Sequence, residues 1–263
     1  MPGEGAEDRL SARLGKLLQH DERPIAERRD LVRLMLLFAR LPPPPDPYGL
    51  FPRYPELKDR YLDATMTSDA EILEERFLAL YSHVHGYEVP YTPEERQRFD
   101  ASGGHLCHVG GLSPILKARA FVGPNTVSVD FGAGNGLQGL LLQTLFPHRK
   151  VVQIELSSRL VEAGRHLQDW LGIDDARVEW IVGDVRDISL SGMDFVYLYR
   201  PLRPTGPGER FYERLAADLE SADRSVVIFS VADCLGPHLS SRFEVLFTDG
   251  HLTCFRRVDR ALS

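Results

Sequence analysis

The sequence lacks the cysteine patterns that mark disulfide-rich and zinc-binding proteins. Its 263 residues include three cysteines, Cys107, Cys234 and Cys254, and no two of them have the spacing CxxC. An odd number of cysteines without that spacing predicts neither a disulfide framework nor a zinc site. We therefore expect no metal centre and a reducing compartment.

Long apolar runs are also missing. No stretch approaches the roughly 18 apolar residues that a membrane-spanning helix needs. The first residues, MPGEGAEDRL, are acidic and polar, whereas a secretory signal is basic and then apolar. We expect a cytoplasmic protein with no membrane partner.

An excess of positive charge is absent as well. The formal net charge is −7 and the isoelectric point is near 5.7. Proteins that bind nucleic acid gather Lys and Arg against the phosphates. Here the N-terminal arginines Arg23, Arg28, Arg29 and Arg33 alternate with acidic residues. We expect no nucleic-acid partner.

The first hundred residues carry helical signals. Apolar residues recur at three- and four-residue spacing over 26–41, and Pro42–Pro45 ends that pattern. Ser68 with Glu71, and Thr92 with Pro93 and Glu95, are typical of helix starts. The sequence thus predicts a helical segment over 1–110, which helps to form an acceptor pocket, and a second domain over 111–263.

After residue 110 the pattern changes to strands that alternate with helices, which predicts a mostly parallel sheet covered on both faces. The expected strands are 126–130, 151–155, 178–182, 195–199, 226–230, 243–247 and 252–257. The last two are joined only by Thr248–His251, which contains the hairpin signal Asp-Gly. We predict a doubly wound α/β sheet of seven strands with an antiparallel C-terminal hairpin.

A glycine-rich turn is the most informative segment. A short apolar strand leads into Gly132-Ala133-Gly134-Asn135-Gly136, and a helix follows. Glycine allows tight turning and close approach of a ligand, and the helix start offers free amides. The turn overlaps the dinucleotide pattern GxGxxG. Asp130, two residues before the first glycine, would repel a pyrophosphate but could accept a hydrogen bond from an ammonium group.

This pattern, Asp130-x-Gly132-x-Gly134-x-Gly136, resembles the first motif of class I S-adenosylmethionine (SAM)-dependent methyltransferases. The resemblance covers about residues 120–257. It implies SAM as cofactor and S-adenosylhomocysteine (SAH) as product. It also implies that Glu155 binds the ribose hydroxyls and that Asp184 and the amide of Val185 contact the adenine. The expected cofactor residues are Asp130, Gly132, Ala133, Gly134, Gly136, Glu155, Leu156, Asp184, Val185 and Tyr199.

The fourth strand leads to the acceptor. Its end, Tyr199-Arg200-Pro201-Leu202, resembles a motif in which amine methyltransferases carry Asn. Arg200 stands where that Asn would be and can only donate hydrogen bonds, so it could bind an anion of the acceptor instead. Tyr199, Arg200 and His105 are the candidate catalytic residues, with His105 as a possible base.

Three functions remain open. The first is a SAM-dependent methyltransferase acting on a small molecule. The second is a protein methyltransferase that modifies lysine or another amine. The third is a SAM-binding protein without catalysis. An NAD-linked oxidoreductase is disfavoured by the terminal hairpin. The acceptor, the methylated atom and the oligomeric state cannot be read from the sequence.

Overall fold

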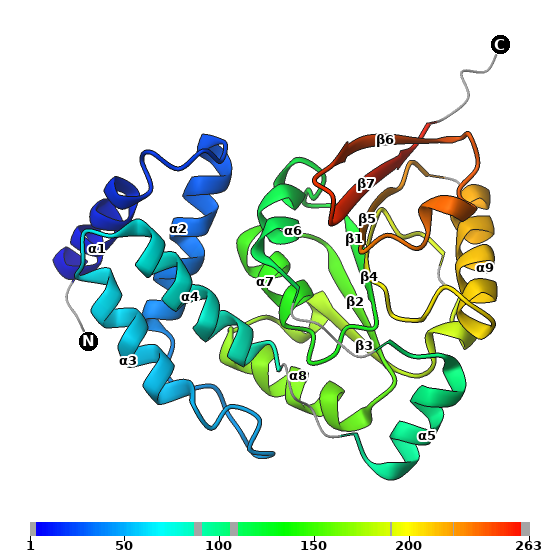
Figure 1. Ribbon diagram of the computed structural model, residues 1–263, viewed down its shortest axis with the longest axis horizontal. Coiled ribbons are helices and arrows are strands. Elements are labelled where there is room, and N and C mark those ends of the chain that lie inside the picture. Colours follow the sequence, from blue (N-terminus) through cyan, green and yellow to red (C-terminus); the bar gives the residue numbers. More distant parts are fainter. Residues whose placement is uncertain (1–3, 87–90, 106–109, 190, 223, 259–263) are drawn as a thin grey trace. The chain divides into compact units, whose positions relative to one another are not determined.

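The computed structural model describes residues 4–86, 91–105, 110–189, 191–222 and 224–258 (Figure 1). The chain forms two compact units, residues 1–88 and 89–263. The sequence predicts a division at 110, whereas helix α5 (Pro93–Ser102) lies in the second unit. A role of the N-terminal segment in an acceptor pocket stays a prediction.

The first unit is helical. Its helices are α1 (Glu4–Leu17), α2 (Ile25–Arg40), α3 (Tyr54–Thr65) and α4 (Ala70–Val84). Their apolar stripes meet in an aromatic core, in which the rings of Phe38 and Phe77 pack edge to face at 5.5 Å. Tyr61 donates a hydrogen bond of 2.7 Å to the carbonyl of Met35, which satisfies its buried hydroxyl group.

Two sequence expectations for this unit need correction. The cap of α4 is Asp69 and not Ser68, because the Asp69 carboxylate accepts hydrogen bonds from the amides of Glu71 and Ile72. Residues 42–56 are rich in proline, which predicts an extended connector, whereas helix α3 begins inside this stretch at Tyr54. Its Pro55 lies in the first turn, where proline costs no helical hydrogen bond.

The second unit contains a sheet of seven strands in the order β3-β2-β1-β4-β5-β7-β6. The strands are β1 (Val127–Phe131), β2 (Lys150–Glu155), β3 (Val178–Val182), β4 (Phe195–Tyr199), β5 (Val227–Val231), β6 (Phe243–Thr248) and β7 (Leu252–Arg257). The first five pair in parallel, and β7 is antiparallel to both β5 and β6. This confirms the predicted fold class and its C-terminal hairpin.

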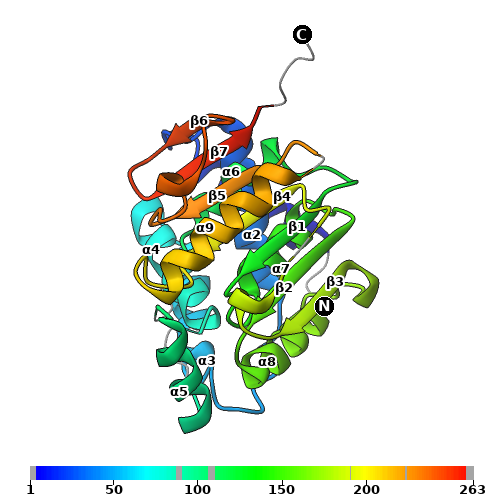
Figure 2. The same ribbon diagram turned by 90° about the vertical axis from the view of Figure 1, so that its right-hand side faces the viewer.

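Helices cover both faces of this sheet (Figures 1 and 2). One face carries α6 (Leu112–Lys117), α7 (Leu137–Leu145) and α8 (Ser158–Trp170), and the other carries α9 (Pro207–Ser221). Phe131 of β1 packs edge to face on Phe211 of α9 at 5.9 Å. Leu142 of α7 packs with Phe195 and Tyr197 on the opposite face. Two apolar layers therefore hold β1 and β4 rigid at the centre of the sheet.

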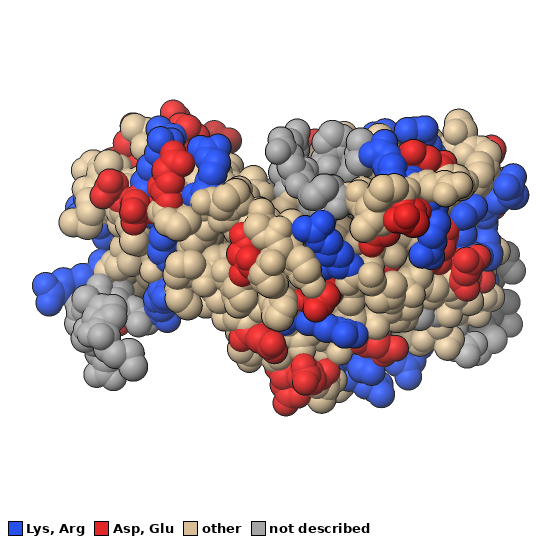
Figure 3. Space-filling model, turned by 90° about the horizontal axis from the view of Figure 1, so that it is seen from below, with Lys and Arg blue, Asp and Glu red and all other residues tan. Residues whose placement is uncertain are grey.

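The surface mixes charges of both signs. Lys and Arg alternate with Asp and Glu over the face in Figure 3. Among the described residues, no helix combines the length and the apolar character that crossing a membrane requires.

Candidate functional site

The glycine turn lies between the end of β1 and the start of α7. The amides of Gly132 and Ala133 both donate to the carbonyl of Ile154 in β2, at 2.9 Å. Gly132, Gly134 and Gly136 have φ angles of 79°, 60° and 70°, in the left-handed region that favours glycine. The turn is thus fixed against the neighbouring strand.

The glycines differ in what surrounds them. A side chain at Gly136 would collide with the ring of Trp180, and a Cβ at Gly132 would lie 3.0 Å from the Cβ of Pro201. At Gly134 a Cβ would meet nothing within 4 Å. Gly132 and Gly136 therefore allow close packing against their neighbours, whereas the space beside Gly134 is open to a ligand.

Glu155 ends β2 and faces this turn. Its Oε2 accepts a hydrogen bond of 3.0 Å from the amide of Gly134, and its Oε1 accepts one of 2.9 Å from the amide of Ser157. Burial raises the pKa of the Glu155 carboxyl to about 7, although the amides of Ser157, Gly134 and Leu156 favour the charged form. A carboxylate has about four lone-pair directions, so it keeps capacity for a hydroxyl donor.

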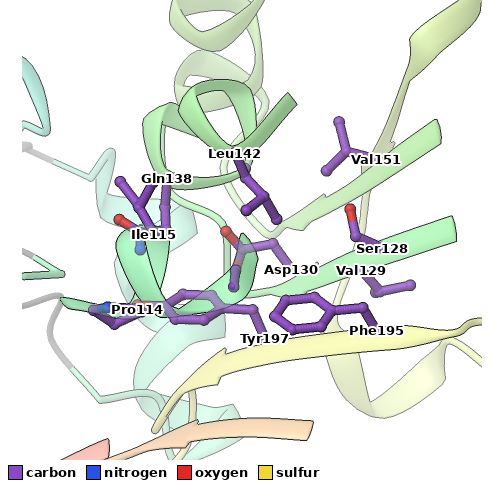
Figure 4. Close-up of a pocket in the computed structure, with 12 residues that line it drawn as sticks. Pro114, Ile115, Ser128, Val129, Asp130, Gln138, Leu142, Val151, Phe195 and Tyr197 are labelled. Carbon is purple, nitrogen blue, oxygen red and sulfur yellow. The ribbon is translucent and has the colours of Figure 1, made fainter. Parts of the chain in front are cut away.

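Asp130 lies on β1, buried on the α7 face. It lines a cavity of about 20 Å³ together with Gln138 of α7, Tyr197 of β4 and Pro114 of α6 (Figure 4). This volume holds about one water molecule. Burial, and next the charge of Glu155, raise the pKa of the Asp130 carboxyl to about 8. Among the described residues, neither of these two neighbouring acids forms an ion pair.

Asp184 follows β3 and caps the short turn Val185–Asp187 through the amide of Arg186, at 2.9 Å. The Arg186 guanidinium also binds both carboxylate oxygens, at 2.7 to 3.1 Å. Burial alone would raise the pKa of Asp184, but these contacts hold it below its usual value. The Val185 side chain is buried in the α9 layer.

The three candidate catalytic residues come together at the end of β4. Residues 103–105 run alongside 201–203: the amide of His105 donates to the carbonyl of Pro201 at 3.1 Å, and the amide of Arg203 donates to that of Gly103 at 2.8 Å. Tyr199 and Arg200 directly precede this pairing. The structure thus brings His105 next to a strand end almost a hundred positions away in the sequence.

Two contacts of this site were not predicted from the sequence. Glu95 of α5 accepts a hydrogen bond of 2.6 Å from the Ser157 hydroxyl, which ties α5 to the loop after Glu155. His251, in the turn between β6 and β7, lies edge to face on Tyr199 at 5.5 Å. Glu95 was recognisable only as part of a capping box, and His251 carried no local signal.

A metal centre is not found among the described residues, which contain no cluster of three or more His, Cys, Asp or Glu side chains suited to one. Cys107 and its neighbour His108 lie outside the described residues. Cys234 and Cys254 are buried free thiols.

No protein-family profile and no curated protein sequence matches this chain. Similar solved structures include an RNA methyltransferase from Salinibacter ruber in complex with SAH, with 20% identity over 60% of this chain and 97% of that one, at a TM-score of 0.46. TrmN from Thermus thermophilus has 16% identity over 56% of this chain and 48% of its own, at a TM-score of 0.43. An rRNA methylase from Streptococcus thermophilus has 11% identity over 58% of this chain and 100% of its own, at a TM-score of 0.42.

The resemblance to class I SAM-dependent methyltransferases is confirmed for the fold. SAH in the Salinibacter structure agrees with the expected cofactor. The expectation of a small-molecule acceptor without a nucleic-acid partner was wrong, because structures similar to this one include enzymes named for RNA and rRNA. The formal net charge sums the whole chain, whereas screening confines each charge to about 10 Å, so a negative sum does not exclude a local contact with nucleic acid.

Proposed function

We propose that the second unit is a SAM-dependent methyltransferase. The observation that carries this proposal is the pair of buried acids, Asp130 and Glu155, beside the open space at Gly134. Such a pair favours a ligand with a cationic group and hydroxyl donors, and it disfavours a pyrophosphate. SAM has an ammonium group, a sulfonium and a ribose, and it has no phosphate.

The residues of the site suit the parts of this cofactor. Asp130 accepts a hydrogen bond from the ammonium group, directly or through the water for which its cavity has room. Glu155 accepts from a ribose hydroxyl, with Leu156 and the turn Gly132–Gly136 beside it. Asp184 has lone pairs left beside those that Arg186 uses, and these would accept from the adenine amino group.

SAM, when bound, would supply an electrophilic methyl group for transfer to the acceptor. The role of the protein would be to position the acceptor for this transfer, and such positioning is worth up to roughly 7–11 kcal/mol of the barrier. Tyr199 and Arg200 lie at the end of β4, where ligands of such folds bind, and the backbone of His105 pairs with Pro201 just beyond it. His105 is the candidate to take a proton if the acceptor carries one.

Isothermal titration with SAM, SAH and NADH in parallel tests the cofactor. We expect micromolar binding of the two adenosyl ligands, no binding of NADH, and loss of SAH binding in Asp130→Ala and Glu155→Ala proteins that remain folded by circular dichroism. Equal SAH affinity in both variants and the unmodified protein would refute the site.

Transfer of labelled methyl from SAM to separate RNA, protein and low-molecular-mass fractions tests catalysis. RNA is the first fraction to examine, because similar structures are named for RNA. We expect label in one fraction, dependent on Asp130. Binding of SAH with no label in any fraction would favour the SAM-binding protein without catalysis.

A further inference from the structure

Arg200 combines an unusual backbone with an unusual environment. It directly follows β4 and has a φ angle of 36°, in the left-handed region. A residue with a Cβ costs roughly 1–2 kcal/mol there. Strain of this kind is kept where the surrounding structure imposes it, often at functional positions.

The side chain of Arg200 is partly buried. Its Nε is fully buried and has no hydrogen-bond partner. The charge of Arg200 acts on the phenol of Tyr212 and the thiol of Cys234. Both groups are otherwise occupied, because Tyr212 donates to the carbonyl of Leu202 at 2.7 Å and Cys234 to that of Ala232 at 3.4 Å.

Asp233, the acid that follows β5, does not neutralise Arg200. Asp233 uses Oδ1 to accept hydrogen bonds from the Ser230 hydroxyl and from the amides of Leu235 and Gly236, which closes the turn after β5. Within the described part of the chain, Arg200 forms no ion pair. The buried Nε of the Arg200 guanidinium therefore has no anionic partner among the described residues, and such a group favours the binding of an anion.

We propose that Arg200 binds an oxyanion of the acceptor, a carboxylate or a phosphate, beside the cofactor turn. This rests on the proposed methyltransferase function. The guanidinium plane offers parallel N–H groups that match two oxygens of such a group. Its position agrees with this role, because Pro201 packs on Gly132 of the turn and binds the amide of His105. The oxyanion would anchor the acceptor while another of its atoms faces the methyl group.

The experiment compares the unmodified protein with Arg200→Gln and Arg200→Lys, each saturated with SAH. Arg203→Gln is the matched control, since Arg203 is an exposed arginine of the same loop. Thermal unfolding is followed against inorganic phosphate, acetate and a single-stranded RNA oligonucleotide, at constant ionic strength. The three probes separate a phosphate from a carboxylate, and a free ion from a phosphodiester chain.

We expect saturable stabilisation of the unmodified protein and of Arg203→Gln by at least one probe. Arg200→Gln should bind that probe about tenfold or more weakly, because charge-assisted hydrogen bonds are lost. Arg200→Lys should be intermediate, since it keeps the charge and loses the planar fork. SAH affinity should stay within about twofold in all variants.

Four results would overturn the proposal. The unmodified protein responds to no probe; Arg200→Gln responds as strongly as the unmodified protein; Arg200→Gln loses SAH affinity, which makes the cofactor carboxylate the counter-ion; or Arg200→Gln unfolds far more easily without any probe, which makes the residue structural. Failure of the unmodified protein to bind SAH refutes the methyltransferase assignment itself, and is seen before any probe is added.

Discussion

The two acids at the cofactor turn hold protons that the unfolded chain would release. The pKa of Asp130 is raised to about 8, by burial first and by Glu155 second, from a usual value of 3.8. The folded state therefore binds a proton more tightly than the unfolded state between about pH 4 and pH 8. The free energy of unfolding should fall as the pH rises through this window, by up to about 1.4 kcal/mol per pH unit for each proton.

Asp130→Asn should flatten this dependence and make the SAH-free protein more stable at pH 8, because asparagine carries no charge to bury. Urea unfolding at pH 6 and at pH 8.5 measures the effect, with the exposed Glu213→Gln on α9 as control. A profile that stays as steep in Asp130→Asn as in the control would show that Asp130 is charged in the free protein. Saturation with SAH should reduce the slope, because an ammonium stabilises the carboxylate.

Glu155 should be sensitive to replacement by its neutral amide, in its affinity for SAH. Both of its oxygens accept hydrogen bonds from backbone amides, at Gly134 and Ser157. In Glu155→Gln an NH2 group would face one of these donors, and a ribose hydroxyl would lose its charged acceptor. We expect SAH affinity to fall about tenfold or more, measured by titration calorimetry, with the circular dichroism spectrum unchanged. Unaltered affinity would mean that the ribose lies elsewhere.

Among the helices and strands, the contact between α8 and β3 places the cofactor turn. A side chain at Gly164 of α8 would collide with the ring of Trp180 of β3, and its Cβ would lie 2.7 Å from the carbonyl of Asn135 in the turn. Trp180 is held in place, because its Nε1 donates to Oε1 of Gln168 at 2.8 Å. Neither the ring nor the carbonyl can move freely.

Gly164→Ala should therefore destabilise the protein by about 1–3 kcal/mol, despite the better helix propensity of alanine. SAH affinity should fall as well, since Asn135 is displaced. Adding Trp180→Phe, which shortens the ring system, should restore part of the stability. Denaturant unfolding of the two single variants and the double variant gives the interaction free energy between residues 164 and 180. Strictly additive effects would contradict the contact.

At this scale the strands were predictable and some other features were not. Apolar runs bounded by turn residues placed β3 and β4 correctly, and for β4 the continuous apolar run reflects burial in the middle of a parallel sheet. The cap of α4 was misplaced by one residue, because Ser68 and Asp69 are both good caps and only the backbone decides between them. The contacts Glu95–Ser157 and His251–Tyr199 join distant segments, and no periodicity reports them.

For the whole molecule, every expected cofactor and catalytic residue lies in the second unit, residues 89–263, together with the complete sheet. We expect a protein of residues 89–263 to fold and to bind SAH within about threefold of the full chain. Calorimetry on both proteins checks this. A fragment that is folded by circular dichroism but does not bind SAH would show that the helical unit contributes to SAH binding.

The left-handed backbone at residue 200 also bears on how acceptor preference could evolve. Asparagine and aspartate tolerate this conformation better than arginine does. Replacing Arg200 by asparagine would relax the main chain and, in the same step, exchange a pure donor for a group that also accepts. One codon would thus reverse the polarity that this position shows to an incoming acceptor, from anion to amine, while the scaffold gains stability. In most active sites a change of specificity costs stability, whereas at residue 200 the change of acceptor preference would increase the stability of the fold.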